Sequence, residues 1–596
     1  MSSLLLDGSA PCGAFPQADG SAVFRIWAPD APAGMMLCVE GHAPRPVAPD
    51  AQGYCAHRLD ACPPGSRYHY RLADGTRMPD PASRLQDGDV HDDSVVVDDS
   101  AYPWRHTHWQ PHAWESSVIY EAHVGLAGGY AGLRERLPAL AALGINVLQL
   151  MPIADFPGRR NWGYDGVLPY APDRAYGEPR ALRQLIDSAH GLGMAVMLDV
   201  VYNHFGPDGN YLPRYAARFF RQDRATPWGA AIDFRQPAVQ RFFEDSAVHW
   251  LQDYRFDGLR LDAVHAIPAP DWLRALPARL RQRLPGRRLY LVIEDEANRA
   301  CLLDAGYDAQ WNDDWHHVMH HLLTGEAQGY YSGYCSGPAG ILARCLTEGW
   351  HYQGQPSPFH GGRPRGEPSA HLPASAFVCF LQNHDQTGNR AHGERLTRLA
   401  ATPQRLQAAI ALQLLTPAVP LIFMGEEYGA QTPFLYFTSH ADAALADAVR
   451  QGRAREFAAM PGYRDEGRGL PDPNAPETFE RCLPWPRNGE HRVWTAYYTR
   501  LLDLRARCLA PRLGGTRAED ATPLGEAAVH AAWRLGDGAR LQAYTNLGAS
   551  ACRLPRRLRP AGQASLRFES TPGCLALMSQ GLLPPDATVC LIQEPS

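Results

Sequence analysis

From about Ser117 onward, short apolar runs alternate with amphipathic stretches of helical period, and this alternation restricts the fold more than any other feature. The helical stretches have Gly or Pro at their ends and include residues 132–143, 179–192, 237–254 and 402–415. The apolar runs begin near eight positions: Val118, Val147, Ala195, Gly258, Tyr290, Asp308, Ala376 and Val419. Eight strands that alternate with helices predict an α/β fold whose parallel sheet closes into a (β/α)8 TIM barrel, rather than an open doubly wound sheet.

The chain has 596 residues, which is too long for one ordinary hydrophobic core and indicates further domains. Residues 1–105 alternate short apolar strands with turns rich in Pro, Gly and Asp, so we expect an N-terminal β-sandwich there. The barrel is expected over 106–515, with long inserted loops at 203–236 and 325–373. Alternating stretches over 516–596 predict a small C-terminal β-domain.

Composition excludes several classes of function. All 57 basic residues are Arg, since the sequence has no Lys, so a P-loop lysine, a pyridoxal Schiff base and a lysine general base are excluded. The net charge of -6 gives no basic field for nucleic acid, and no run approaches the roughly 20 apolar residues that span a membrane. The 13 Cys lack the spacing of metal ligands or redox motifs. We therefore expect a cytoplasmic monomer or homodimer without a cofactor.

Four of the predicted strands end in acidic side chains. These acids are Asp199, Asp262, Glu294 and Asp385, and Arg260 lies two residues before Asp262. A charge within a buried strand is costly unless it is paired, and the carboxyl ends of barrel strands meet at one mouth. Each acid alone could be an exposed loop residue or a helix N-cap, but four of them at strand ends predict one shared site.

Such a cluster suits either glycoside hydrolysis or a metal site. Glycosidic cleavage needs one protonated and one ionised carboxyl group. A two-metal hydrolase would also use Asp and His, and His204, His265 and His384 keep that alternative open. Arg260 argues against it, because a guanidinium group repels a cation while it keeps Asp262 ionised.

Aromatic residues are frequent near the proposed mouth, and they favour a sugar ligand because flat rings stack on the apolar faces of pyranose units. Packing in the core is the alternative for any one of them. They are Trp162, Tyr164, Tyr170, Tyr176, Tyr202, Tyr211, Trp228, Trp311 and Trp315.

The segments around the acids resemble the signature regions of the α-amylase family of glycoside hydrolases, and the similarity extends over residues 22–483. The matching residues, region by region, are Asp199, Asn203 and His204; Arg260, Asp262 and His265; Glu294; His384 and Asp385. The resemblance implies a retaining enzyme in which Asp262 is the nucleophile, Glu294 the general acid/base and Asp385 the third essential carboxylate. It also implies that His204 and His384 bind the cleaved sugar, with Tyr164 stacked beneath it. By the same resemblance, the 106–515 barrel is catalytic and the 1–105 sandwich is carbohydrate-binding-like.

Further stretches are similar to the malto-oligosyltrehalose trehalohydrolases of that family: residues 161–166, 201–211, 226–234, 310–317, 382–390 and 423–430. This similarity implies hydrolysis of the α-1,4 bond next to the terminal trehalose unit of maltooligosyl trehalose, or of a related α-glucan, with trehalose and a malto-oligosaccharide as products. Segments 311–317 and 203–234 are our candidates for recognition of trehalose. The residues expected to bind substrate are Tyr164, Asp199, Asn203, His204, Arg260, His265, Trp311, Asp313, Asp314 and His384, and no metal ligand is expected.

One segment departs from the family pattern, because residues 291–298 contain an additional acid. Strand alternation places Glu294 and Glu296 on one side and Asp295 on the other, so we assign the acid/base to Glu294, with Glu296 as the alternative. Two other functions stay open: an α-1,4-glucan branching enzyme and a non-catalytic glucan-binding module on the same fold. The intact acids Asp262, Glu294 and Asp385 argue against the module.

Overall fold

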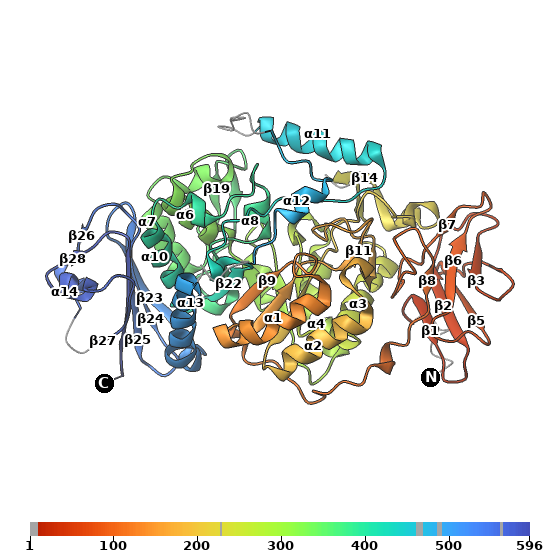
Figure 1. Ribbon diagram of the computed structural model, residues 1–596, viewed down its shortest axis with the longest axis horizontal. Coiled ribbons are helices and arrows are strands. Elements are labelled where there is room, and N and C mark those ends of the chain that lie inside the picture. Colours follow the sequence, from red (N-terminus) through yellow and green to blue (C-terminus); the bar gives the residue numbers. More distant parts are fainter. Residues whose placement is uncertain (1–9, 227–228, 460–468, 486–491, 561–563, 596) are drawn as a thin grey trace.

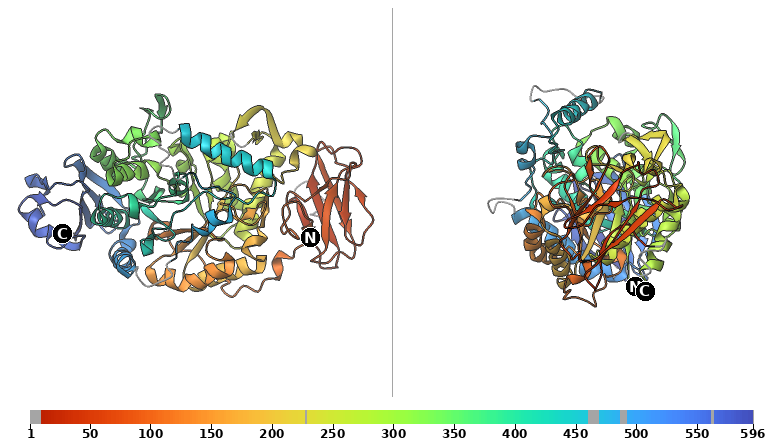
Figure 2. Two further views of the ribbon diagram at one scale, coloured as in Figure 1. Left: turned by 45° about the horizontal axis from the view of Figure 1, so that its top comes forward. Right: turned by 90° about the vertical axis from the view of Figure 1, so that its right-hand side faces the viewer.

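The computed structural model describes residues 10–226, 229–459, 469–485, 492–560 and 564–595. Figure 1 shows a strand-rich N-terminal part in red, a central barrel surrounded by helices, and a C-terminal sheet in blue. The two smaller parts lie on opposite sides of the barrel, as the turned views in Figure 2 also show. Within the described residues, no helix combines the length and the apolar character needed to cross a bilayer.

The central sheet is a closed barrel of parallel strands, in which the last strand, β22, pairs with the first, β9. Each strand begins within one residue of its predicted start, so the predicted barrel is confirmed and the open sheet is wrong. The strands are β9 (Ile119–Ala122), β10 (Val147–Leu150), β13 (Ala195–Val200), β16 (Gly258–Leu261), β17 (Tyr290–Ile293), β18 (Ala309–Trp311), β21 (Phe377–Phe380) and β22 (Val419–Phe423).

Helices cover the outside of the barrel. In α2, Leu182, Leu185, Ile186 and Ala189 recur at helical spacing and are all buried, so the helix packs one apolar stripe on the sheet. Proline at the first turn fixes the start of several helices, where the missing N–H costs nothing. The helices are α1 (Gly129–Leu143), α2 (Pro179–Gly191), α3 (Pro237–Gln252), α4 (Pro270–Arg283), α5 (Ala300–Asp304), α6 (Asp313–Thr324), α7 (Pro338–Glu348), α8 (His384–Gly388), α9 (Leu396–Leu399), α10 (Pro403–Leu414), α11 (Ala443–Ala459), α12 (Pro476–Glu480) and α13 (Arg492–Leu504).

The barrel interior is filled by a separate apolar cluster that includes Val147, Met197, Val292, Trp311 and Phe380. Side chains of alternate residues fill a barrel of this size, so its centre is a packed core and not a channel. Polar side chains at the strand ends therefore lie on top of an apolar floor.

The N-terminal part consists of two antiparallel sheets, as expected for a β-sandwich. Three ion pairs join it to the first insertion of the barrel: Arg218 to Asp30 at 2.9 Å, Arg214 to Asp74 at 3.0 Å and His91 to Asp208 at 3.0 Å. Its strands are β1 (Gly13–Pro16), β2 (Ala22–Trp27), β3 (Met36–Val39), β4 (Arg45–Pro46), β5 (Tyr54–Leu59), β6 (Arg67–Arg71), β7 (Arg77–Met78) and β8 (Ser94–Val95).

The C-terminal part is a five-stranded antiparallel sheet in the order β23-β24-β25-β29-β27, accompanied by a small two-stranded sheet and one helix. Thr588 packs against α10, where its hydroxyl donates to the Ala408 carbonyl at 2.7 Å. The elements are β23 (Arg517–Pro523), β24 (Ala528–Arg534), β25 (Arg540–Asn546), β26 (Cys552–Arg553), β27 (Ala564–Glu569), α14 (Cys574–Ser579), β28 (Leu582–Leu583) and β29 (Ala587–Gln593).

Additional short strands lie in the connections that follow the barrel strands. The 203–236 insertion contains β14 (Phe220–Thr226) and β15 (Gly229–Ile232), and the 325–373 insertion contains α7, β19 (Gln355–Ser357) and β20 (Arg363–Arg365). After β10, the chain forms β11 (Ala154–Asp155) and β12 (Leu168–Pro172). The loops that follow barrel strands surround the mouth of a TIM barrel, so these insertions are placed to form the wall of a site.

Candidate active site

A cavity of about 390 Å³ lies where the barrel strands end, within the size range of small-ligand sites. The three predicted catalytic acids, Asp262, Glu294 and Asp385, all face it. The lining residues are Trp162, Tyr164, His204, Arg260, Asp262, Ala263, His265, Glu294, Glu296, Asp313, His317, Tyr330, Tyr334, Tyr352, Ser357, Phe359, His360, Arg365, His384, Asp385, Gln386 and Asn389.

Arg260 is the centre of the polar contacts at the floor of this cavity. Its Nη1 donates to Asp262 Oδ1 and to both carboxylate oxygens of Asp199, each at 2.8 Å, and its Nη2 donates to Glu294 Oε2 at 2.7 Å. The guanidinium carbon lies 4.3 Å from the centre of the Trp311 ring, which supports it from below. Three acids from three different strands thus share one buried cation.

The surroundings of Asp262 and Glu294 push their two pKa values in opposite directions. Burial raises the pKa of Asp262, but the charges of Arg260 and His204 outweigh it and leave this pKa below its ordinary value. Burial raises the pKa of Glu294 well above its usual range, Arg260 only partly offsets this, and the charges of Asp262 and Asp385 add to it. One ionised and one protonated carboxyl group are the pair that cleavage of a glycosidic bond requires.

The main chain around the nucleophile candidate also contributes. Ala263 follows Asp262 in a left-handed conformation with φ of 40°, which is unusual for a residue with a side chain. Its backbone N–H donates to Glu294 Oε2 at 2.9 Å. Asn203 Nδ2 donates to Asp262 Oδ2 at 2.7 Å, so each of the two acids has its orientation fixed by more than one donor.

Tyr164 and His384 form another side of the cavity, where their rings stack with centroids 5.1 Å apart. The Tyr164 hydroxyl donates to Asp199 Oδ2 at 2.8 Å and lies 2.8 Å from His384 Nε2. The other ring nitrogen, Nδ1, bonds to Glu121 Oε1 at 2.5 Å. Burial lowers the pKa of His384, but Glu121 outweighs burial and the net pKa is raised. Both rings are therefore held in place without a ligand.

The same hydrogen bonds bear on the two-metal alternative. His204 Nε2 lies 2.9 Å from the Tyr164 carbonyl oxygen, and its Nδ1 contacts the side-chain oxygen of Asn203. Both nitrogens of His204 and both nitrogens of His384 thus face oxygens of the protein. A histidine that binds a metal needs one nitrogen free for it, so this arrangement disfavours the metal site.

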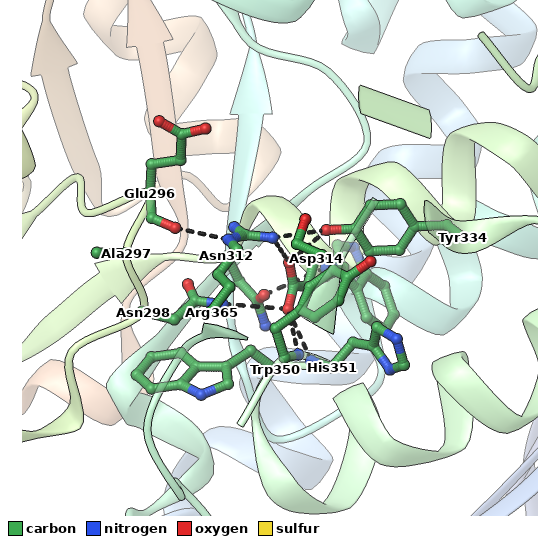
Figure 3. A network of polar contacts seen from close by, with 12 residues as sticks. Glu296, Ala297, Asn298, Asn312, Asp314, Tyr334, Trp350, His351 and Arg365 are labelled. Atoms are coloured by element: carbon green, nitrogen blue, oxygen red, sulfur yellow. Dashed lines mark hydrogen bonds and ion pairs between the residues drawn. The ribbon is translucent and has the colours of Figure 1, made fainter. Parts of the chain in front are cut away.

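Figure 3 shows how the second insertion is fixed to the barrel through Asp314 on α6. The Asp314 carboxylate accepts hydrogen bonds from Arg365 Nη1 at 2.7 Å and from the Tyr334 hydroxyl at 2.5 Å. It also accepts from Asn298 Nδ2 at 3.1 Å and from the backbone N–H groups of His351 and Tyr352 at 2.8 and 2.9 Å. Burial raises the pKa of Asp314, but Arg365 and these hydrogen bonds lower it below the ordinary value.

Asp313 and His317 lie one turn apart on α6, and both line the cavity. Burial raises the pKa of Asp313 to about 7, with Arg365 opposing and Asp385 adding to the rise. Burial also lowers the pKa of His317 well below its ordinary value, so the ring is neutral. Among the described residues its Nδ1 is buried without a hydrogen-bond partner.

The structure separates the ten residues expected to bind substrate into two groups. Tyr164, His204, Arg260, His265, Asp313 and His384 line the cavity. The other four are not among the lining residues, so their contact with substrate stays a prediction. Asp199 and Trp311 lie beneath Arg260, Asn203 holds Asp262, and Asp314 faces the insertion instead of the cavity.

Most of the aromatic residues expected at the mouth belong to the core. Only Trp162 and Tyr164 among the described ones line the cavity. Burial in the core stabilises large aromatic side chains, which explains why most of these residues do not line the cavity. Tyr170, Tyr176, Tyr202, Trp311 and Trp315 are buried, Tyr211 contacts His91, and Trp228 lies outside the described residues.

The crowded acids after β17 follow the predicted alternation. Glu294 and Glu296 both line the cavity, whereas Asp295 turns away and pairs with Arg299 at 2.8 Å. Glu296 lies farther out, where it pairs with His360 at 2.8 Å and its side chain is 42% exposed. Glu294 contacts Arg260 directly, which favours Glu294 over Glu296 as the acid/base.

Sequence reasoning missed most of the wall that the second insertion supplies. Tyr330, Tyr334, Phe359, His360 and Arg365 line the cavity, although residues 325–373 show no period that would predict which side chains point inward. The position of His317 in the cavity could have been predicted, because it lies four residues after the predicted Asp313 on the same helix.

Comparisons with known proteins agree with this arrangement. Residues 83–224 match the family "Alpha amylase, catalytic domain", and residues 516–590 match a domain of unknown function, DUF3459. A malto-oligosyltrehalose trehalohydrolase from Deinococcus radiodurans is 39% identical over 452 residues, which cover 74% of each chain. Another from Arthrobacter ramosus is 39% identical over 505 residues, covering 81% of this chain and 86% of the relative.

A solved structure matches over nearly the whole length. A crystal structure from Salmonella typhimurium, named provisionally as an alpha amylase, is 39% identical with a TM-score of 0.90, and the match covers 98% of this chain and 99% of that one. A 1,4-alpha-glucan branching enzyme from Corynebacterium jeikeium is 31% identical over 283 residues, which cover only 43% of this chain and 39% of the relative.

The closed barrel, the acids at its strand ends and the matching catalytic domain define a glycoside hydrolase of the α-amylase family. The curated relatives narrow this class, since they share more than a third of their residues with this chain over most of its length. The chain belongs to the malto-oligosyltrehalose trehalohydrolase family.

Proposed function

We propose that the chain hydrolyses the α-1,4-glucosidic bond next to the terminal trehalose unit of maltooligosyl trehalose, releasing trehalose and a malto-oligosaccharide. The main support for this chemistry is that the pKa of Asp262 is lowered and that of Glu294 is raised, although both acids are bound to one arginine. The names of the relatives support the substrate.

The proposed mechanism begins with Asp262 as the nucleophile. Its ionised carboxylate attacks the anomeric carbon while Glu294 gives its proton to the glycosidic oxygen, so the C–O bond to trehalose breaks and a glycosyl–Asp262 ester forms. Glu294, now ionised, takes a proton from water, and the resulting hydroxide displaces Asp262. Two inversions at one carbon give net retention, and Glu294 recovers its proton.

Asp385 is the third proposed catalytic carboxylate, which holds sugar hydroxyls and favours distortion of the ring. Tyr164, His204 and His384 are proposed to bind the sugar whose bond is cleaved, with the Tyr164 ring beneath it. We place the trehalose unit on the other side, against α6 and the 325–373 insertion. The support for this placement is that Asp313 and His317 of α6 line the cavity together with Tyr334 and Arg365 of the insertion.

The assignment is tested by Asp262→Asn, which removes the nucleophile but keeps a similar shape. We expect kcat to fall at least about 10³-fold with an unchanged melting temperature. Asp271→Asn on α4 is the control, because the Asp271 side chain is 99% exposed and should leave kcat unaltered. An Asp262→Asn enzyme that keeps a tenth or more of the wild-type activity would contradict the assignment.

The substrate is tested by incubation with maltotriosyl trehalose and identification of the released sugars. Free trehalose, with the new reducing end first appearing in the α configuration, supports the proposal. A retaining mechanism also predicts the Asp262 and Glu294 carboxyl groups about 5 to 5.5 Å apart. New α-1,6 branches in amylose would favour the branching enzyme, and calorimetric binding without turnover would favour a non-catalytic module.

We also propose a cytoplasmic location and a monomeric or homodimeric state. The 13 cysteines are free thiols, which supports a reducing compartment. Titration with a thiol reagent, after the unreduced protein is denatured, should count 13 thiols. Light scattering gives the mass of the protein in solution. A smaller thiol count would indicate disulfides and an oxidising compartment.

A further inference from the structure

Asp385 lies on a helix of only five residues, α8, so its orientation depends on what holds the end of that helix. Asn389 follows directly after Gly388, and its side-chain Nδ2 donates to Asp385 Oδ1. The backbone N–H of Asn389 also donates to the Asp385 carbonyl at 3.0 Å. Asn389 therefore binds both the side chain and the main chain of Asp385.

A residue from a distant helix holds Asn389 in turn. Arg453 on α11 donates from Nη1 to Asn389 Oδ1 at 3.1 Å and from Nη2 to the Gly388 carbonyl at 3.2 Å. Its guanidinium carbon lies 5.0 Å from the centre of the Tyr436 ring and 4.8 Å from that of Phe457, which keeps the cation in place. Figure 1 shows α11 as a long cyan helix at the edge of the molecule, and the two bonds of Arg453 connect it to the end of α8.

The turn at the end of α8, formed by Gly388 and Asn389, is also fixed by a second contact. A Cβ atom at Gly388 would lie 2.0 Å from Trp162 Cζ2, so only glycine allows the Trp162 ring to pack against this turn. Trp162 lines the cavity, as do Asp385 and Asn389. The turn is therefore in contact with both a cavity-wall ring and the α11 guanidinium group.

An asparagine amide can present either its NH2 group or its oxygen to a neighbour, and only the NH2 group binds a carboxylate. Arg453 can only donate, so its bond to Oδ1 requires the Asn389 oxygen to face α11 and the Nδ2 to face Asp385. Without Arg453 the amide is free to turn, and its oxygen would then repel the carboxylate.

We propose that Asn389 and Arg453 are positioning residues for Asp385, through which α11 fixes the orientation of the third carboxylate. The inference rests on the proposed function in one respect, the catalytic role of Asp385. Neither residue needs to touch the reacting atoms, so their loss should act on kcat more than on KM.

The test compares Arg453→Met with Arg450→Met on the same helix. Arg450 is exposed and forms an ion pair with Asp447, so its replacement should leave kcat unchanged. We expect Arg453→Met to lower kcat on maltotriosyl trehalose about 10- to 100-fold, because misplacement of a catalytic group by about 1 Å has effects of this size. KM should change less than about 3-fold and the melting temperature little, and Arg453→Lys, which can still donate to Asn389, should recover part of kcat.

A double-mutant cycle completes the test. If the relay is real, Arg453→Met should have little further effect in an Asn389→Ala enzyme, because the link to Asp385 is already lost. Equal kcat for the two arginine variants, or additive losses in the cycle, would overturn the inference. Asp385→Asn is measured alongside. High activity of that variant would reject the catalytic role of Asp385. An inactive Asp385→Asn together with a fully active Arg453→Met would reject only the positioning role of Asn389 and Arg453.

Discussion

At the scale of single residues, the site depends on how one cation is shared among several acids. Arg260 contacts Asp199, Asp262 and Glu294, yet the neighbours of each acid differ. Asp262 receives a further amide donor, whereas Glu294 faces additional negative charge, so the same arginine leaves one acid ionised and the other protonated. Activity should therefore require a pH above the pKa of Asp262 and below that of Glu294.

The alkaline limit of activity should respond to Asp313. Its negative charge is one of the causes that raise the pKa of Glu294, and its own pKa is about 7, so it carries this charge mainly above that pH. Asp313→Asn removes the charge, lowers the pKa of Glu294, and should move the alkaline limb of the kcat/KM profile to lower pH. The Asp271→Asn control should keep the wild-type limb. An unmoved limb in Asp313→Asn would contradict the assignment of Glu294 as the acid.

At the scale of elements, a buried ion pair helps to fix the 325–373 insertion to α6. The side chains of Arg365 and Asp314 are 7% and 0% exposed, and their atoms approach to 2.7 Å. Breaking such a pair from one side leaves the other charge buried without its partner.

Arg365→Met should lower the free energy of unfolding by about 3 to 5 kcal/mol, because the Asp314 carboxylate stays buried. Arg363→Met on the same strand, β20, is the matched control, since Arg363 is exposed and should change stability by less than about 0.5 kcal/mol. Chemical denaturation measures both, and limited proteolysis should cut within residues 325–373 earlier in Arg365→Met alone. Equal stability of the two variants would show that the pair does not anchor the insertion.

The depressed pKa of Asp314 adds a pH dependence to the same element. A carboxyl group whose pKa is lower in the folded protein stabilises the fold fully above its unfolded pKa. That contribution is lost as the pH falls through the folded pKa, so the insertion should loosen in acid although Arg365 keeps its charge.

The elements were predictable where a repeating pattern exists. Alternation of strand and helix placed all eight barrel strands, and acids at strand ends identified Asp262, Glu294 and Asp385 as neighbours of one cavity. The direction of a side chain next to a strand end was less predictable. Trp311 ends its strand inside the barrel, and Asp314 turns toward the insertion although Asp313 beside it faces the cavity. Inward residues of the insertion had no pattern at all, because tertiary contacts alone decide which loop side chains point in.

At the scale of the whole molecule, the two smaller domains meet the barrel at different elements. The N-terminal part pairs with the 203–236 insertion, which also carries His204 of the cavity. The C-terminal sheet instead packs on α7 and α10. Its attachment to α10 includes Asp586, which accepts from Thr402 Oγ1 at 2.7 Å and from Arg405 Nε at 2.8 Å. Stability and activity should therefore be separable at the C-terminal attachment.

Asp586→Ala should remove both hydrogen bonds to a charged group and lower the stability by about 1.5 to 3 kcal/mol. Asp586 also has a left-handed φ of 49°, which Asn tolerates better than Ala, so Asp586→Asn should keep the backbone and lose less stability. None of Asp586, Thr402 and Arg405 lines the cavity, so kcat on maltotriosyl trehalose should stay within about 2-fold of wild type for both variants. Calorimetric melting and steady-state kinetics on the same preparations test whether stability and activity are separable. A fall in kcat without a fall in melting temperature would show that the C-terminal sheet takes part in catalysis.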